Sequence, residues 1–158
     1  MLRNAYLAVA VATAYLATAS IAIAQAEPPD GAIRITPDEL RWGPGRVPGH
    51  LIAPLVGASN RPGAYIERVR FPANTVSQAH SHPEDRNYTV ISGTWYVGYG
   101  DRYELERLKA LPPGSFYTEP ANVNHFSLTK DEAVVVQIVG SGPSATRFVD
   151  PPAPATKP

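Results

Sequence analysis

Apolar and polar residues alternate along residues 63–72, so side chains two positions apart would share one face of a β-strand. Arg68 and Arg70 fall on one face, which we expect to meet solvent because burying an unpaired charge is costly. Glu67 falls on the other face, among apolar side chains. The alternation therefore predicts an inward-facing carboxylate that either finds a partner inside or reaches water at the rim.

Short strand-like segments recur along the chain and are separated by Gly, Pro, Asn and Asp, which favour turns. The predicted strands are residues 32–35, 50–56, 63–72, 76–82, 88–97 (two strands hinged at Gly93), 115–119, 133–139 and 146–149. Residues 101–111 alone look helical, because Leu105, Leu108 and Leu111 recur about every third position. Many short strands with one short helix indicate an all-β sandwich or barrel.

Residues 1–26 have the pattern of an export signal rather than of a folded segment. Arg3 supplies a positive start, an alanine-rich apolar stretch follows, and Ala24-Gln25-Ala26 fits a cleavage site. The alternative is an uncleaved membrane anchor, since the stretch is long enough to span a bilayer. With cleavage after Ala26 we expect a periplasmic or secreted protein that has no contact with the membrane.

The rest of the chain has the length of one domain. Residues 27–62 are rich in Pro and Gly and predict an N-terminal arm with short strands. An arm of this kind packs across its own barrel or onto a second copy, which makes a homodimer one expectation. Residues 63–150 predict the barrel, and the Pro-rich residues 151–158 predict a disordered tail.

Composition argues against several classes of function. Basic and acidic residues both number 14, so the formal charge is zero at pH 7. This balance gives no support for a partner such as nucleic acid or an anionic membrane surface. Cysteine is absent, which excludes disulfides, thiolate metal ligands and cysteine nucleophiles.

Three of the four histidines have a spacing that suits a metal ion. His80 and His82 would point to the same side of a strand, and His125 could add a third imidazole from a distant segment. Three nitrogen ligands on one side suit Fe, Mn, Ni, Cu or Zn and leave positions open for a substrate. The fourth histidine, His50, is expected at the surface.

The same residues carry a resemblance to the cupin superfamily, which has two sequence motifs. The first motif has a glycine, five residues, His-x-His, three or four residues, a glutamate, six residues and a glycine. The residues at its fixed positions here are Asn74, His80, His82, Arg86 and Gly93. The second motif has a glycine, five residues, Pro-x-Gly-x-x-His and often a later asparagine. The residues at its fixed positions here are Gly114, Pro120, Asn122, His125 and Thr129.

The resemblance implies a double-stranded β-helix, the jelly-roll barrel of the cupins. It also implies one divalent transition metal ion, held by His80, His82 and His125. Asparagine at the two glycine positions is compatible with the motifs, because it tolerates left-handed backbone better than other non-glycine residues. Arg86 stands where the glutamate ligand of the motif would be, so the sequence resembles the cupins that hold their metal with three histidines.

Residues near the three histidines have predicted catalytic roles. Arg86 would neutralise an anionic substrate or intermediate, and Glu67 or Gln78 would orient or move a proton, although Gln78 could equally be a polar residue at the barrel mouth. We expect Arg86 to pair with Glu67, because an arginine near a metal ion needs compensation. The alternatives are that Arg86 turns outward to water or awaits an anionic substrate. Glu84 and Asp85 are predicted to be exposed turn residues.

Two functions fit this sequence. The first is a mononuclear metal enzyme that acts on a small organic molecule, with dioxygenase chemistry implied by the resemblance to three-histidine cupins. The second is an exported cupin that captures a metal ion or small ligand without turnover. A third alternative, in which the histidines are core residues without a metal, remains open.

Overall fold

The computed structural model describes residues 29–150. The predicted export signal, residues 1–26, and the predicted tail, residues 151–158, lie outside the described residues and stay predictions. Within the described part of the chain, no helix is long and apolar enough to cross a membrane. The chain divides after Arg34 into two units, and the second unit contains all the strands described below.

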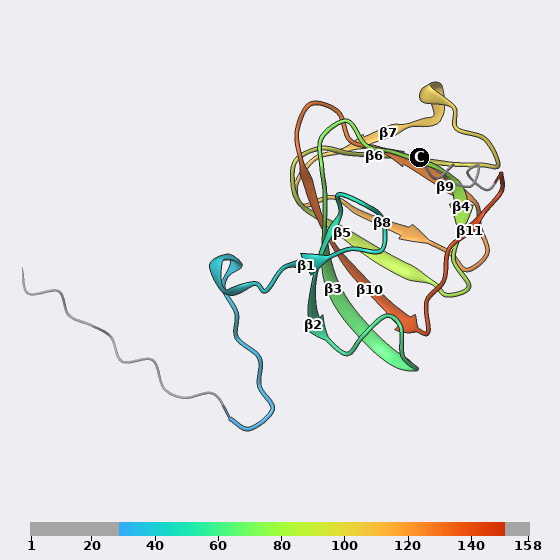
Figure 1. Ribbon diagram of the computed structural model, residues 1–158. Coiled ribbons are helices and arrows are strands. Elements are labelled where there is room, and N and C mark those ends of the chain that lie inside the picture. Colours follow the sequence, from blue (N-terminus) through green and yellow to red (C-terminus); the bar gives the residue numbers. More distant parts are fainter. Residues whose placement is uncertain (1–28, 151–158) are drawn as a thin grey trace, which may run out of the picture. The chain divides into compact units, whose positions relative to one another are not determined.

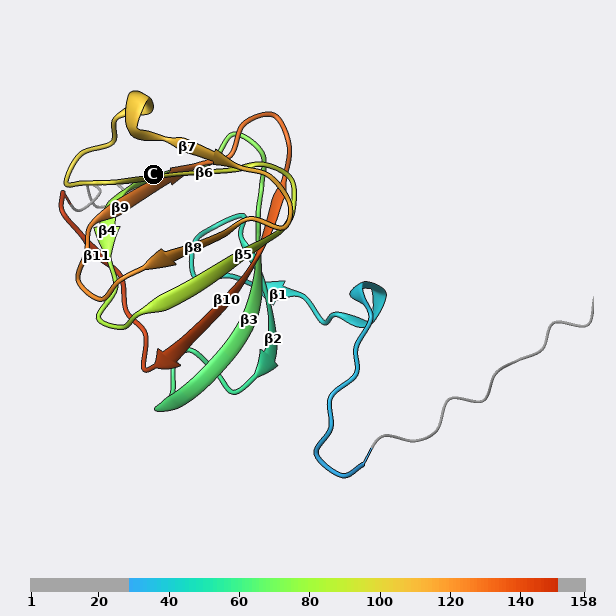
Figure 2. The same cartoon turned by 180° about the vertical axis from the view of Figure 1, so that it is seen from behind.

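The strands form two antiparallel sheets. The six-stranded sheet has the order β1 (Gly43–Pro44), β2 (Leu51–Val56), β3 (Gly63–Phe71), β10 (Val134–Gly142), β5 (Arg86–Ser92) and β8 (Phe116–Glu119). The five-stranded sheet has the order β11 (Arg147–Phe148), β4 (Val76–Ser81), β9 (His125–Leu128), β6 (Trp95–Tyr99) and β7 (Lys109–Leu111). In Figures 1 and 2 the sheet with β6 and β9 faces the sheet with β3, β10 and β5. The predicted all-β jelly-roll barrel is confirmed.

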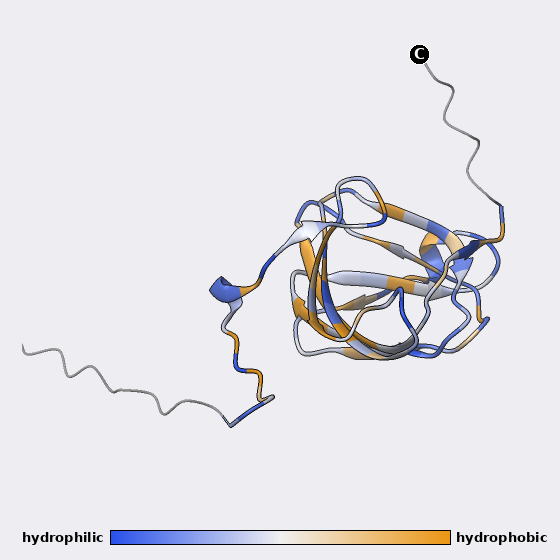
Figure 3. Ribbon diagram, turned by 60° about the horizontal axis from the view of Figure 1, so that its bottom comes forward, coloured by the Kyte–Doolittle hydropathy of each residue, from blue (hydrophilic) through white to orange (hydrophobic). Residues whose placement is uncertain are grey.

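The core lies between the two sheets and is built from side chains on alternate strand positions. On β3 the predicted alternation is confirmed: Tyr65, Glu67 and Val69 are buried, whereas Arg70 is exposed. The main cluster of buried side chains comprises Tyr65, Val69, Tyr88, Val90, Trp95, Val97, Leu111, Tyr117, Val134, Val136 and Ile138. Hydrophobic and hydrophilic positions can be followed along the strands in Figure 3.

The segment predicted as an N-terminal arm contributes two strands to the six-stranded sheet. The strand predicted at residues 50–56 is confirmed as β2, which pairs with β3, and β1 pairs with β2. Pro37–Glu39 form a single 3-10 turn. Residues 32–35 were also expected to be a strand, and this is wrong: they form no regular element. A short apolar segment becomes a strand only when a neighbour pairs with it.

The helix predicted over residues 101–111 is also largely wrong. Only Leu105–Arg107 is helical, as one 3-10 turn, and Lys109–Leu111 is strand β7. Strand β7 pairs with β6, with Leu111 opposite Trp95, so its backbone groups gain hydrogen-bond partners that a short helix would not supply. Leu105 is 66% exposed, so the three leucines do not form one buried helical face.

Three motif positions, Asn74, Gly93 and Asn122, have left-handed backbone conformations that suit their residue types. Asn74 and Asn122 have φ values of 56° and 61°, the left-handed conformation in which asparagine is tolerated. The Asn122 N–H donates a hydrogen bond to the His82 carbonyl at 2.7 Å, which ties the second motif to the first. Gly93 has a φ of 71°, and a Cβ there would lie 2.7 Å from the Ala133 carbonyl oxygen. Glycine is therefore required at this hinge between β5 and β6.

Candidate metal centre

Three histidines from two neighbouring strands meet at one point. His80 is on β4, His82 directly follows β4, and His125 begins β9. His80 and His125 are opposed residues in the antiparallel pairing of β4 with β9. One ring nitrogen from each lies within 4.8 Å of the other two, and His82 and His125 are buried while His80 is half-buried. The predicted cluster is therefore present in the structure.

Each imidazole is oriented by a hydrogen bond from its Nδ1 to a backbone carbonyl. The acceptors are Gln78 for His80 (2.7 Å), Ala145 for His82 (2.7 Å) and Val123 for His125 (3.0 Å). A carbonyl oxygen can only accept, so the proton of each ring is on Nδ1 and the lone pair is on Nε2. Hydrogen bonds of this kind fix the tautomer of metal-binding histidines.

Burial keeps the three rings neutral. It lowers the pKa of His82 to about 2 and that of His125 to about 4, and it also lowers the pKa of His80. Neutral imidazole is the form that binds a metal. The His125 Nε2 is buried and has no hydrogen-bond partner within the described residues. Such an orphaned acceptor is unusual unless a ligand satisfies it, so the donor set fits a metal ion.

Glu119, which the sequence did not single out, lies against the same cluster. Its Oε1 is 3.3 Å from the His125 Nε2, and its Oε2 is 3.5 Å from the His82 Nε2. The residue is 4% exposed, and burial raises the pKa of its carboxyl group. The signal in the sequence was the alternation within residues 115–119, where Tyr117 and Glu119 share the inward face of β8.

Arg86 is buried at the start of β5 but does not form the predicted ion pair with Glu67. Its Nε donates to the Glu84 Oε1 at 2.8 Å, Nη1 donates to the Tyr88 hydroxyl at 3.4 Å, and Nη2 donates to the Ser144 hydroxyl. The prediction of an exposed Glu84 is also wrong, because its side chain is 9% exposed. Glu84 reaches Arg86 from only two residues away along the chain, and so it takes the place expected for Glu67.

Glu67 is buried as predicted but belongs to a different hydrogen-bond chain. Its Oε2 accepts a hydrogen bond from the Ser59 hydroxyl at 2.7 Å. Arg46 in turn donates to the Ser59 oxygen at 2.8 Å. The carboxylate is thus compensated through Ser59, and Arg46 is its indirect positive partner.

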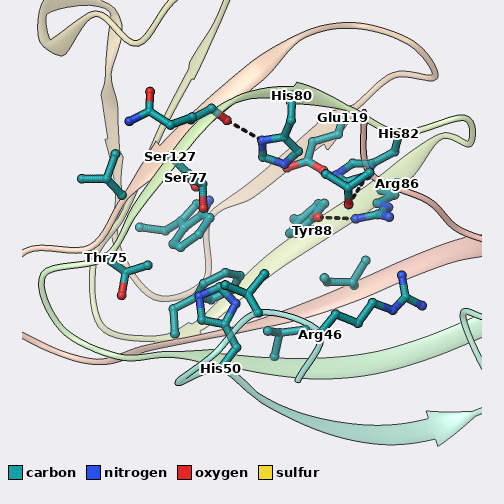
Figure 4. A pocket seen from close by; sticks show the side chains of 18 of the residues that line it. Arg46, His50, Thr75, Ser77, His80, His82, Arg86, Tyr88, Glu119 and Ser127 are labelled. Carbon is teal, nitrogen blue, oxygen red and sulfur yellow. Dashed lines mark hydrogen bonds and ion pairs between the residues drawn. The ribbon is translucent and has the colours of Figure 1, made fainter. Parts of the chain in front are cut away.

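A cavity of about 350 Å³ extends from the histidines between the sheets. The three predicted catalytic residues, Arg86, Glu67 and Gln78, all line it. The side chains of His80 and His82 are at one end of the view in Figure 4, and His50 is at the other. The apolar wall is formed by Ile52, Val69, Phe71, Trp95 and Ile138.

His50 was expected at the surface, and that expectation is wrong. The residue is 8% exposed, and its ring packs edge-on against Phe71 with centroids 4.5 Å apart. Its position just before β2 turns it into the cavity. The His50 Nε2 is buried without a hydrogen-bond partner in the described part of the chain. The cavity therefore has polar groups at both ends and apolar side chains between them.

Comparisons with known proteins agree with this fold. The model of the ChrR cupin-like domain family matches residues 30–145. Among solved structures, the polyketide cyclase RemF from Streptomyces resistomycificus is 16% identical with a TM-score of 0.64, and the match covers 77% of this chain and 88% of that one. Salicylate 1,2-dioxygenase from Pseudoaminobacter salicylatoxidans is 17% identical with a TM-score of 0.53, covering 65% and 30%.

KdgF from Halomonas sp. is 19% identical with a TM-score of 0.52, and the match covers 68% of this chain and 93% of that one. No curated protein sequence matches the chain. Identities at this level show the fold alone, and proteins with one fold perform different chemistry. The family model covers most of the chain, including both histidine motifs. The chain belongs to the ChrR cupin-like domain family of the cupin superfamily.

Proposed function

We propose that this chain binds one divalent transition metal ion through His80, His82 and His125 and acts on a small organic molecule as a mononuclear, dioxygenase-type enzyme. The observation that supports it most directly is the cluster of three histidines, of which His80 and His82 line a largely apolar cavity. A metal in such a site would supply Lewis-acid or oxygen-activating chemistry. Imidazole ligands alone do not select among Fe, Mn, Ni, Cu and Zn.

The cavity bounds the class of substrate. A volume of about 350 Å³ lies at the small end of the usual range for ligand pockets. Apolar and aromatic walls favour a substrate with an apolar body. A polar group is needed at each end to meet the histidine cluster and the His50 Nε2, which has no partner among the described residues. We therefore propose a small aromatic or branched aliphatic substrate with polar groups at both ends.

Arg86, Glu67 and Gln78 keep their proposed roles with changes in detail. Arg86 would place positive charge near an anionic group of the substrate, with its own side chain held by Glu84, Tyr88 and Ser144. Glu67 borders the cavity and is oriented by Ser59, so it could accept a proton from the bound molecule. Gln78 orients His80 through its backbone carbonyl, whereas its side chain is exposed.

Oxygen uptake tests the proposed reaction. The purified chain would be loaded with Fe(II), Mn(II), Ni(II), Cu(II) or Zn(II) in turn and mixed with small aromatic acids. Salicylate and gentisate, named in the structure of the similar dioxygenase, are the first compounds to try. We expect one metal form to consume oxygen with a substrate, and His80→Ala to abolish the uptake. Ligand binding without oxygen uptake or product would favour the second function, a non-catalytic binding cupin.

We also propose that the protein is exported and cleaved after Ala26, which would make it periplasmic or secreted. Support comes from the sequence pattern of residues 1–26. Intact-mass measurement on protein exported by its own leader is the test. A mature chain beginning at Glu27 agrees with the proposal, and a mass that retains Met1 to Ala26 contradicts it.

A further inference from the structure

We propose that Glu119 is a fourth ligand of the metal and replaces the carboxylate that the first motif lacks at Arg86. The inference rests on the proposed metal binding by the three histidines. Glu119 would add an anionic oxygen ligand to three neutral nitrogen ligands. It lies on β8, outside the first motif. A site of this composition suits a hard or borderline divalent ion such as Fe(II), Mn(II), Ni(II) or Zn(II) better than Cu(I).

The distances from Glu119 to the histidines match those between ligands of one ion. Two donor atoms bound at about 2.0–2.2 Å and separated by a tetrahedral angle lie about 3.3–3.6 Å apart. The Glu119 Oε1 lies 3.3 Å from the His125 Nε2, and Oε2 lies 3.5 Å from the His82 Nε2. Both separations are longer than an ordinary N–H···O hydrogen bond. The carboxylate is therefore spaced as a further ligand of the ion that the three histidines would bind.

The hydrogen-bonding capacity of these groups points the same way. The His82 and His125 rings donate from Nδ1 to backbone carbonyls, so each Nε2 can only accept. An ionised Glu119 can also only accept. The His125 Nε2 and the Glu119 Oε2 are both buried without a hydrogen-bond partner in the described part of the chain. Acceptors that face one another in a buried site are costly unless a cation or a proton lies between them.

The Glu119 carboxylate is oriented by a hydrogen bond to one of its two oxygens. The Trp95 Nε1 donates to the Tyr117 hydroxyl at 2.8 Å, and that hydroxyl donates to the Glu119 Oε1 at 3.2 Å. All three residues are buried. Ligating carboxylates are commonly oriented by hydrogen bonds in this way. Oε1 keeps a lone pair beside the one that accepts from Tyr117, and Oε2 accepts no hydrogen bond in the described part of the chain. Both oxygens can therefore reach the metal.

The sheet register explains how the carboxylate reaches the position. Arg86 and Glu119 are opposed residues of the antiparallel strands β5 and β8, and both are buried. Opposed side chains lie on the same face of a sheet. The position where the first motif carries a glutamate thus has a glutamate directly across from it. The carboxylate beside the histidines therefore comes from β8, while Arg86 occupies the motif position on β5.

The variant Glu119→Gln tests the proposal, and Glu67→Gln is the matched control. Both replace a buried carboxylate that lines the cavity by its isosteric amide, but Glu67 bonds to Ser59 and not to the histidines. The amide of Gln can donate to the His125 Nε2, so the metal-free Glu119→Gln chain should fold at least as well as the metal-free wild type. Thermal unfolding in the presence of a chelator checks this. Glu119→Leu provides a second variant, whose side chain has no atom that can bind a metal.

Two measurements decide the outcome: metal affinity by chelator competition with Zn(II), and the visible spectrum of the Co(II)-loaded chain. We expect Glu119→Gln to lose more than the ~10–100-fold in affinity that removal of an outer partner costs, and to change the Co(II) spectrum. Glu67→Gln should keep both. Wild-type affinity and spectrum in Glu119→Gln would overturn this inference alone. A wild-type chain that binds neither ion would overturn the proposed function together with it.

Discussion

Arg86 and Glu119 lie directly opposite each other on β5 and β8, with opposite charges buried at the edge of the histidine cluster. They do not form an ion pair within the described residues, because Arg86 directs its Nε to Glu84 at 2.8 Å. Burial raises the pKa of Glu119, and the charge of Arg86 counteracts that shift. The arginine therefore helps to keep the buried carboxyl group ionised, which is the state a metal ligand needs.

The Glu84–Arg86 pair should show strong coupling in a double-mutant cycle. Both side chains are about one-tenth exposed, and removing one partner of a buried pair typically costs ~3–5 kcal/mol. We expect Glu84→Leu and Arg86→Leu each to lower the free energy of unfolding by about that amount, and the double variant to lose clearly less than the sum. Denaturant unfolding measures all three variants. Strictly additive losses would mean that the pair contributes nothing through its contact.

A parallel cycle with Glu67→Leu and Arg86→Leu is the control. Glu67 bonds to Ser59 and forms no ion pair with Arg86 in the described part of the chain. The coupling energy of this second cycle should therefore be much smaller than that of the first. A larger coupling between Glu67 and Arg86 would reverse the assignment of the partner.

His50 should make the metal-free protein sensitive to acid. Burial lowers the pKa of its imidazole below the usual 6.5, so the unfolded chain binds a proton that the folded chain does not. Stability is therefore unaffected by His50 above pH 6.5 and falls as the pH decreases towards the lowered pKa. We expect His50→Phe to reduce the slope of unfolding free energy against pH in this window.

The measurement is denaturant unfolding at several pH values between 7 and 5 with a chelator present. His80, His82 and His125 also have lowered pKa values, so some slope should remain in the variant. The difference between the two slopes isolates His50. Equal slopes in the wild type and His50→Phe would show that His50 does not stay neutral on folding.

His50 should also affect ligand binding without affecting the metal. Its Nε2 has no hydrogen-bond partner among residues 29–150 and lies at the end of the cavity opposite His80 and His82. A polar group of the ligand would meet it there. Loss of one hydrogen bond to a neutral donor or acceptor costs about 0.5–1.5 kcal/mol. We expect His50→Phe to weaken ligand affinity about 2–10-fold while metal content stays at the wild-type level. Unchanged ligand affinity would remove His50 from the binding site.

Much of the barrel could be predicted from sequence because every second side chain of a strand points to the same face of the sheet. The alternation on β3 placed Glu67 inward correctly, and the spacing of His80, His82 and His125 predicted their convergence. Local patterns failed where a neighbouring strand decided the structure. Residues 109–111 became a strand because the edge of β6 was available to pair with them.

The partners of charged groups were harder to predict than the strands. The alternation along β3 places the Glu67 side chain inside the barrel. It does not predict that the Ser59 hydroxyl will bind Glu67, or that the Glu84 side chain will bind Arg86. Glu119 could have been found, since it shares the inward face of its strand with Tyr117. Its proximity to His82 depends on how strands distant in sequence are arranged, which no local pattern encodes.

Metal content is the most direct test of metal binding by His80, His82 and His125. The untagged chain would be purified, incubated with each of Fe(II), Mn(II), Ni(II), Cu(II) and Zn(II), dialysed and analysed by elemental analysis beside His125→Ala. We expect one ion per wild-type chain for at least one metal and a large loss of that ion in His125→Ala, because two remaining imidazoles and a carboxylate form a weaker site. A wild-type chain that retains no metal, or a His125→Ala chain with full occupancy, would contradict this expectation.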